Sequence, residues 1–201
     1  GGGNWTGLRF GDTVGEIEWI HDFFGAGTKI STGIQSDDDV WHSAVGTYDG
    51  TVLKVYIDGI LKTTSASKPN CLLSTTNVWR IGRRSEFDAE YFDGQIAELG
   101  FWVGVALNLS QIESLADGFS PLFYPNNLEL YIPLIGRASP ELELMSGNTG
   151  TLVNAPVNFA HPRIIYPTSF QDRRFTTAAA VAGGKEDWPV LTGNKFWGWR
   201  Y

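Results

Sequence analysis

Cysteine is nearly absent. Cys71 is the only one in 201 residues, which excludes an intrachain disulfide and a cysteine-based zinc site. We expect Cys71 to be a small core residue. No apolar run approaches the roughly 20 residues that a membrane-spanning helix requires, and no signal-peptide pattern is recognisable. The chain opens on GGGNWTG without a methionine, which we interpret as a processed or truncated end, and the sequence leaves open whether residues precede Gly1.

Positive charge is also scarce: the chain has 15 Lys and Arg residues against 22 Asp and Glu residues, which gives a net charge of −7. The corresponding isoelectric point is about 4.9. A chain with this balance repels phosphate backbones, so we do not expect nucleic acid as a partner.

Glycine and aromatic residues are plentiful, with 24 Gly, 12 Phe, 8 Trp and 7 Tyr. This combination favours turns and pleated sheets over helices. The hydrophobic fraction of 42% against a charged fraction of 18% is typical of a globular chain. The length suits one all-β domain of the larger kind, or one domain with a tail.

The clearest strand pattern is WHSAVGTYDGTVLKVYIDGILKTT, residues 41–64. In its second part Leu53, Val55 and Ile57 recur at every other position and form one inward row. Asp49-Gly50 predicts a type I′ hairpin turn, in which both central residues need positive φ. Asp58-Gly59 predicts a further turn. Strands about ten residues apart, separated by such turns, indicate a β-sandwich or jelly roll.

One segment, LSQIESLADG at 109–118, has a helix pattern. Ser110 followed by Glu113 predicts a capping box at its start, and Gly118 predicts its end. The residues spaced for one buried stripe are Ile112, Leu115 and Ala116.

The last part of the chain, from about residue 167, has proline, small residues and few strand patterns. We therefore divide the chain into a body, residues 1–166, and an extended C-terminal arm, residues 167–201. A tail without a partner would seldom end so apolar. The arm residues that we expect to bind a partner are Trp188, Phe196, Trp197, Trp199 and Tyr201.

Three segments carry a family resemblance: WHSAVGTYDGTVLKVYIDGIL, WRIGRRS and YFDGQIAELGFWVGVALNLSQIESLADG. In this order they resemble the laminin-G-like, concanavalin A-like jelly roll over about residues 36–120. The resemblance implies an all-β, two-sheet antiparallel jelly-roll sandwich, here with one short helix and the extended arm. It also implies that His42 is structural and that Trp41 is a core residue beside Leu53, Val55 and Ile57.

Residues 118–167 are similar to the C-terminal half of laminin-G-like proteins encoded among bacteriophage virion genes. Within them LELYIPLIG and SGNTGTLVNAP resemble the first strands of ordinary family members, yet here they follow the hairpins. Either this late strand, residues 128–135, completes the sheet from its other end, or it pairs with a neighbouring subunit. Both arrangements would close an open sheet edge.

The family that the chain resembles includes endoglucanases, whose paired carboxylates follow a Glu-x-Asp-x-x-Glu pattern on one strand. The nearest match here is Glu86, Asp88 and Glu90, whose last carboxylate comes one residue early. We expect a solvated, charge-paired loop at this place, and no catalytic residue.

Metal and sugar sites are weakly indicated. Asp37, Asp38 and Asp39 are candidates for calcium, the only cofactor considered, but neighbouring residues of one loop cannot all point inward, so a solvated acidic turn is favoured. The histidines at 21, 42 and 161 have no metal spacing. A sugar-stacking platform could use some of Trp5, Trp19, Trp79 and Trp102, although core packing is the more usual role of such residues.

Three functions remain. The favoured one is a non-enzymatic virion protein, such as a capsid decoration, head-fibre or tail-associated subunit, whose arm binds other virion proteins or like subunits in an oligomer. The second is a lectin-like module that binds host surface glycans outside the cell or at its surface. The third and least favoured is a glycan hydrolase.

Overall fold

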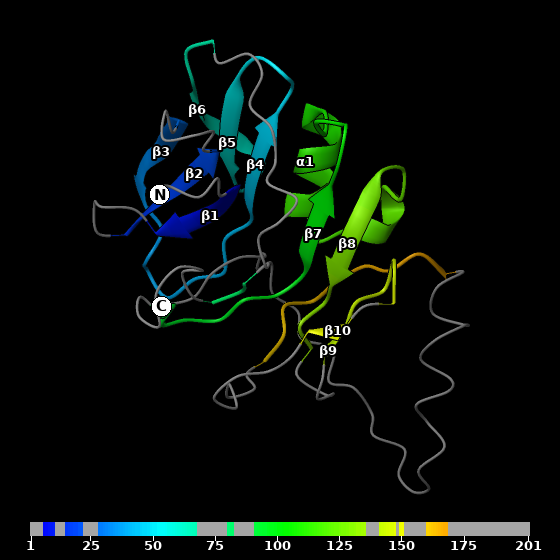
Figure 1. The fold of residues 1–201 in the computed structure, drawn as a ribbon. Helices are drawn as coiled ribbons and strands as arrows, with labels where there is room; N and C mark the ends of the chain where they lie inside the picture. Colours follow the sequence, from blue (N-terminus) through cyan, green and yellow to red (C-terminus); the bar gives the residue numbers. More distant parts are fainter. Residues whose placement is uncertain are drawn as a thin grey trace, which may run out of the picture.

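The computed structural model describes residues 6–10, 15–21, 28–67, 80–82, 91–135, 141–147, 149–150 and 160–168. This part of the chain is mostly β, with antiparallel sheets and one α-helix (Figure 1). Its elements are β1 (Thr6–Phe10), β2 (Glu16–His21), β3 (Thr28–Gln35), β4 (Ala44–Tyr48), β5 (Leu53–Ile57), β6 (Ile60–Thr64), β7 (Leu99–Trp102), α1 (Leu109–Ala116), the 3-10 helix η1 (Pro121–Phe123), β8 (Leu128–Ile132), β9 (Glu141–Leu142) and β10 (Thr149–Gly150).

The first sheet has the order β1-β2-β3, and both pairs are antiparallel. Its register places Leu8 opposite Trp19 and Trp19 opposite Ile30. These three apolar side chains therefore lie on one face of the sheet. On the other face Arg9 pairs with the buried Glu18 at 2.8 Å, and Lys29 approaches the same carboxylate at 3.1 Å.

The second sheet has the order β4-β5-β6, and two hairpins connect its antiparallel strands. Between β5 and β6 both turn residues have positive φ, 52° at Asp58 and 78° at Gly59, as a type I′ turn requires. At the first turn Gly50 has positive φ and Asp49 does not. The Asp49 side chain instead accepts hydrogen bonds from the amides of Thr51 and Val52. The type I′ prediction for Asp49-Gly50 is therefore wrong.

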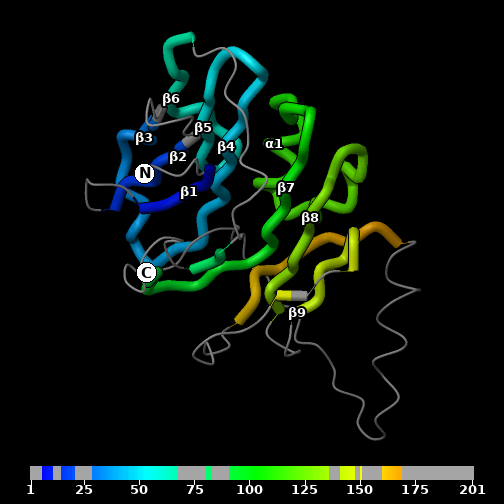
Figure 2. Tube along the Cα trace, viewed as in Figure 1, coloured from blue at the N-terminus to red at the C-terminus, as the bar shows by residue number. Residues whose placement is uncertain are grey.

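The two three-stranded sheets pack against each other, as their positions in Figure 2 also show. Trp19 and Ile30 of the first sheet form one buried cluster with Leu53 and Val55 of the second. The Trp19 indole lies so close to the backbone of β4 that a Cβ on Gly46 would overlap it. Glycine at this position therefore sets the spacing of the two layers.

Helix α1 covers the opposite face of the second sheet. Tyr56 of β5 is buried there in a cluster with Leu107, Ile112 and Leu115, so β5 is buried on both faces. The N-cap lies two residues before the expected one, because Asn108 caps the helix and forms the capping box with Gln111. The buried stripe is Ile112, Leu115 and Ala116, as the spacing predicts.

The late strand pairs within the chain. Strand β8 runs antiparallel to β7, with Leu99 opposite Ile132 and Phe101 opposite Leu130. Tyr131 of β8 is fully buried in a cluster with Leu122 and Leu128. Residues 128–132 therefore pair within the chain. They do not complete either three-stranded sheet, as the first of the two arrangements expected, because β7 and β8 form a two-stranded sheet of their own.

Residues 160–168 form a segment that we call the strap, drawn in orange in Figure 1, where it passes the end of β8. Ile165 makes an isolated parallel bridge with Phe119, just after α1. The Ile165 amide donates to the Gly118 carbonyl at 2.8 Å, and the Ser120 amide donates to the Ile165 carbonyl at 2.9 Å. The strap, which is mostly the last part of the body, is thus bound to the rest of the body through its backbone.

The inward row of β5 is buried, since Leu53, Val55 and Ile57 are each at most 1% exposed. Trp41, the fourth residue expected in the core, is half-buried. In the described part of the chain no helix is long and apolar enough to span a membrane. Cys71 and the five aromatic arm residues lie outside the described residues.

Candidate functional site

A buried carboxylate, that of Glu98, lies directly before β7. Its side chain has no exposed surface, and its backbone is in the left-handed region with φ 56°. The Glu98 amide donates to the Pro133 carbonyl at 3.0 Å, which ties this residue to the end of β8. A buried carboxylate is stable only with partners that compensate its lost hydration.

Three side chains supply that compensation. The hydroxyl of Tyr131 on β8 donates to Glu98 Oε2. The Tyr166 hydroxyl on the strap donates to Glu98 Oε1 at 2.8 Å, and Nε2 of His161, also on the strap, lies 3.2 Å from the same oxygen. Behind them the Ser120 hydroxyl donates to the Tyr131 hydroxyl at 3.2 Å. We call Glu98, Tyr131, His161 and Tyr166 the clasp.

The electrostatics of the clasp follow from its burial. The pKa values of Tyr131 and Tyr166 are raised, first by burial and then by the Glu98 charge, so both phenols stay neutral donors. Burial disfavours the charged form of His161, but its hydrogen bonds to Glu98 and to the Pro133 carbonyl outweigh that effect and raise its pKa. Below the raised pKa of His161, its charged ring therefore lies against the Glu98 carboxylate.

A second buried carboxylate, Glu143, supports β8 from the side of β9. It accepts the Tyr131 amide at 2.9 Å, the Met145 and Ser146 amides at 2.6 Å each, and the Gly147 amide at 3.0 Å. Burial opposes its charge, yet these donors and the Ser146 hydroxyl lower the pKa of Glu143 to about 2. The turn after β9 is therefore built around one ionised side chain.

The loop before β4 carries a bridging histidine. His42 Nδ1 lies 2.8 Å from Asp58 Oδ2 in the β5–β6 turn, and its Nε2 lies 3.0 Å from Asp38 Oδ1. The hydrogen bond to Asp58, followed by that to Asp38, raises the pKa of His42. His42 thus has a structural role, because it connects the acidic loop to the second hairpin.

This loop does not assemble the calcium site considered above. Asp38 is engaged by His42 and by the Val40 amide, whereas the Asp37 carboxylate faces the backbone of Gly15. Asp39 has a left-handed backbone with φ 63°. Within the described ranges no group of three or more His, Cys, Asp or Glu residues is placed to hold a metal ion.

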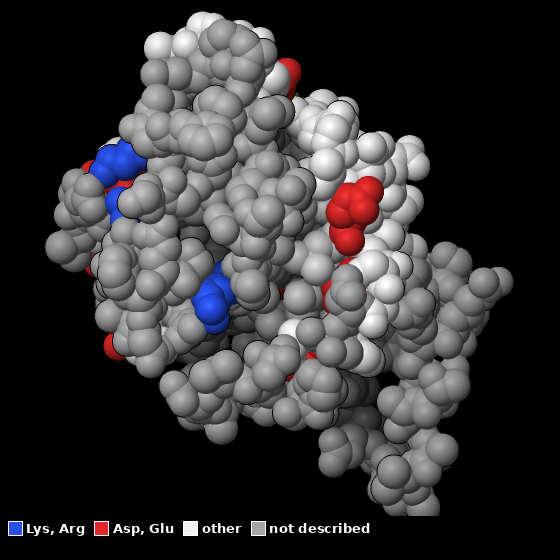
Figure 3. All heavy atoms as spheres, in the orientation of Figure 1, with Lys and Arg blue, Asp and Glu red and all other residues white. Residues whose placement is uncertain are grey.

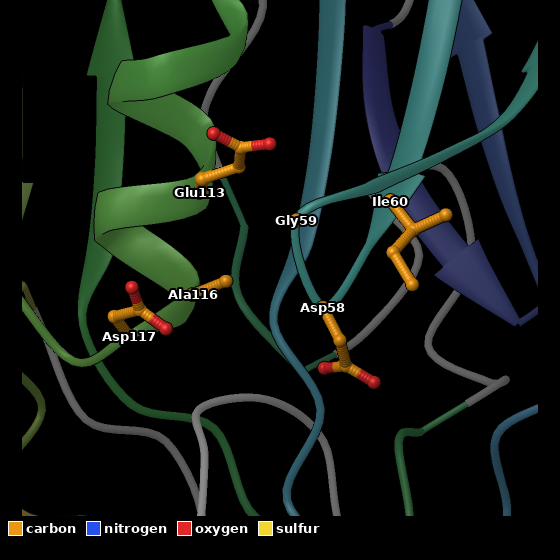
Figure 4. A pocket seen from close by; sticks show the side chains of 6 residues that line it. All are labelled: Asp58, Gly59, Ile60, Glu113, Ala116 and Asp117. Carbon is orange, nitrogen blue, oxygen red and sulfur yellow. The ribbon is translucent and has the colours of Figure 1, made fainter.

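An open groove lies between the β5–β6 turn and α1 (Figure 4), with a volume of about 390 Å³. Its wall on the turn side is Asp58, Gly59 and Ile60, and its wall on the helix side is Glu113, Ala116 and Asp117. The approach of the two walls depends on Gly59, since a Cβ there would lie 3.2 Å from the Glu113 Cα. Both Asp58 oxygens are engaged, by His42 and by the Ser43 amide, so the Glu113 and Asp117 carboxylates are the acceptors that the groove offers to a hydroxyl-bearing ligand.

Elsewhere the surface charge is dispersed. In Figure 3 the described acidic and basic side chains on the visible face lie in separate small groups. They form no continuous patch of one sign over the described part of this face.

Several residues singled out from the sequence have other roles or cannot be placed. Trp19 is buried between the sheets. Trp102 is half-buried and donates from Nε1 to the Tyr124 carbonyl at 2.8 Å, so neither indole is an exposed stacking platform. The candidates outside the described residues are Trp5, Trp79, Glu86, Asp88 and Glu90, and the side chain of His21 is not described either.

Sequence reasoning missed the clasp. Glu98 stands in the apolar run QIAELGFW, and a lone acid in such a run is the signal that could have marked it for burial. Its partners Tyr131 and Tyr166 are 33 and 68 residues away. No local pattern relates positions so far apart.

Comparison with known proteins gives one family. A family model described as Concanavalin A-like lectin/glucanases superfamily (Laminin_G_3) matches residues 1–113. No curated protein matches the chain. Among solved structures, an S-layer domain-containing protein (residues 221–444) from Clostridium thermocellum is similar at 22% identity with a TM-score of 0.35. That match covers 50% of this chain and 51% of that one, so it spans about half of either length. Because the family model covers more than half of the 201 residues, the chain belongs to the concanavalin A-like lectin/glucanase superfamily.

Proposed function

We propose that the protein is a non-enzymatic structural subunit of a bacteriophage virion, a capsid decoration, head-fibre or tail-associated protein. Its body is a two-sheet jelly roll over residues 1–166. Its arm, residues 167–201, binds like subunits or other virion proteins.

The clasp is the observation that carries this proposal. The strap directly precedes most of the arm, and two of its side chains, His161 and Tyr166, reach one buried carboxylate at 3.2 and 2.8 Å. The bound strap fixes the point on the body from which the arm starts. This lowers the entropy that the arm loses when it binds a neighbour.

The apolar residues of the arm supply the driving force. Each large side chain contributes about 1.5–3 kcal/mol when it is fully buried. The five aromatic residues at its end are Trp188, Phe196, Trp197, Trp199 and Tyr201. Together they could hold a subunit in an assembly even after the cost of ordering the arm.

Deletion of residues 185–201 tests the proposal. We expect the shortened protein to keep the far-UV spectrum and melting temperature of the full chain and to lose its self-association in sedimentation velocity. A matched control replaces Lys185 and Lys195 by serine, which changes charge in the same segment and leaves the aromatic residues in place. Association of the shortened chain at the affinity of the full chain would contradict the proposal.

A second candidate function is glycan binding in the groove beside α1. The carboxylates of Glu113 and Asp117 can accept hydrogen bonds from sugar hydroxyls, and the 60% exposed side chain of Ile60 offers an apolar contact at the rim. Superfamily membership supports this candidate only by analogy. A glycan array with the full chain tests it: binding should disappear in Glu113→Gln and Asp117→Asn and persist in Glu129→Gln, an exposed acid on β8.

A hydrolase is the third candidate. Turnover of a β-glucan by the full chain that disappears in Glu86→Gln would place it first and would contradict the structural proposal.

A further inference from the structure

The strap is attached to the body at two ends that share one anchor. His161 near its start and Tyr166 near its end both contact Oε1 of the buried Glu98. Between them the Ile165 backbone exchanges two hydrogen bonds with the segment after α1. Loss of either side-chain contact would leave a short segment held by few remaining bonds.

The surroundings of the His161 ring determine its charge. Nδ1 lies 2.9 Å from the Pro162 carbonyl oxygen, and Nε2 lies 2.9 Å from the Pro133 carbonyl oxygen and 3.2 Å from Glu98 Oε1. All three partners are acceptors. A neutral imidazole has one nitrogen without a proton, and its lone pair would then face an oxygen lone pair. The geometry therefore fits the doubly protonated ring.

We propose that His161 is a pH-operated latch: its protonated ring holds the strap on the body, and its deprotonation releases the strap while both three-stranded sheets stay folded. The latch is a property of the body and the strap. It does not depend on what the arm binds, or on whether it binds at all.

The other titratable groups around the ring are the Glu98 carboxylate before β7, the Tyr131 hydroxyl on β8 and the Tyr166 hydroxyl on the strap. Arg163, also on the strap, is exposed. The raised pKa values of both tyrosines keep them neutral where His161 titrates. The stabilisation from His161 is then complete below its unfolded pKa of about 6.5. It is lost as the pH rises through the higher pKa of the folded protein.

Cleavage by trypsin after Arg163 reports release of the strap. The Arg163 side chain is exposed, while the backbone beside it is bound at Ile165. A protease must extend the backbone around the cut bond, so cleavage requires the strap to open. The full-length protein is digested between pH 7 and 9.5, and the Arg163–Ile164 cut is quantified by mass spectrometry. A free peptide of residues 160–168 in the same buffers corrects for the pH dependence of trypsin.

The corrected rate should rise with pH by up to about tenfold per unit between the unfolded pKa of about 6.5 and the higher folded pKa of His161, and should level off above the folded pKa. Cleavage after Lys62 in β6 is an internal control for unfolding of the sheets. Its rate, corrected in the same way for the pH dependence of trypsin, should stay constant. A flat corrected rate would overturn the latch, as would a parallel rise at Lys62, because the body would then unfold as a whole.

Two variants locate the effect. His161→Gln should be cleaved after Arg163 with no corrected pH dependence. His42→Gln, which removes the other histidine between acceptors, should keep the pH dependence of the original protein. If His161→Gln and the original protein showed the same pH dependence of cleavage after Arg163, the latch would be contradicted. These readouts involve no association, so the latch can fail while the assembly proposal stands, and the reverse.

Discussion

Gly46 shows how one residue sets the spacing of the two sheets. It lies in β4 opposite the Trp19 indole, at a position where any Cβ would overlap the ring. Trp19 belongs to the cluster that joins the sheets. Interiors are close-packed, so an added atom here must displace either the indole or the strand.

The first prediction compares two strand glycines. Gly46→Ala should lower the free energy of unfolding by about 1–3 kcal/mol, because it overpacks the contact with Trp19. Gly7→Ala in β1 is the matched control, since a Cβ there meets no atom within 4 Å, and we expect no loss of stability. Urea unfolding of both variants measures the difference, and equal midpoints would contradict this account of the packing.

Glu143 gives a prediction at the same scale with a defined pH dependence. Its pKa is lowered from an ordinary 4.5 to about 2 by the donors around it. A group with a depressed folded pKa stabilises the protein above its unfolded pKa, and that stabilisation is lost as the pH falls through the folded value.

At pH 7, Glu143→Gln should lower the free energy of unfolding by about 3 kcal/mol, from 1.36 kcal/mol per pKa unit. The difference from the unmodified protein should shrink between about pH 4.5 and pH 2. Glu129→Gln on the exposed side of β8 is the control and should show no such trend. Denaturant titrations at pH 7, 4 and 3 provide the measurement, and a difference that stays constant over this range would refute the assigned pKa.

At the scale of elements, α1 shows where local patterns mislead. Two cap signals overlap in NLSQIES: Ser110 with Glu113, and Asn108 with Gln111. The structure uses the second pair. Both fit the same local rule, and both are compatible with the buried stripe of Ile112, Leu115 and Ala116. The local pattern therefore does not fix the start of this helix.

The two caps can be separated by mutation. Asn108→Ala should cost about 1 kcal/mol, because the Gln111 amide loses its acceptor. Ser110→Ala lies inside the helix and should cost less than half as much or be neutral. Thermal unfolding of the two variants distinguishes them, and a larger effect at Ser110 would restore the cap expected from sequence.

At the scale of the whole molecule, the elements that could be predicted are those whose signal is local. The inward row of β5, the turn at Asp58-Gly59 and the buried stripe of α1 all follow from spacings of two to four residues. The sequence left open whether β8 pairs within the chain or with a neighbouring subunit, because the pattern of one strand does not identify the strand that it pairs with.

The clasp could not be predicted for the same physical reason. It brings together Glu98, Tyr131 and His161 from three separate segments. Glu98 stands out as a lone acid in an apolar run, but no local pattern relates it to its partners. The acidic run that does have a visible local pattern did not form the site considered for it. The Asp37–Asp39 run does not converge on one point, since His42 engages Asp38 and the Gly15 backbone lies against Asp37.

The central claim is that an anchored body carries an apolar arm that holds an assembly together. Its most direct test keeps the length of the chain and replaces Trp188, Phe196, Trp197, Trp199 and Tyr201 by serine. Sedimentation velocity should then show the full chain as an associating species and the variant as a monomer with an unchanged far-UV spectrum. If both sediment alike over the same concentrations, the arm does not drive assembly and the claim is contradicted.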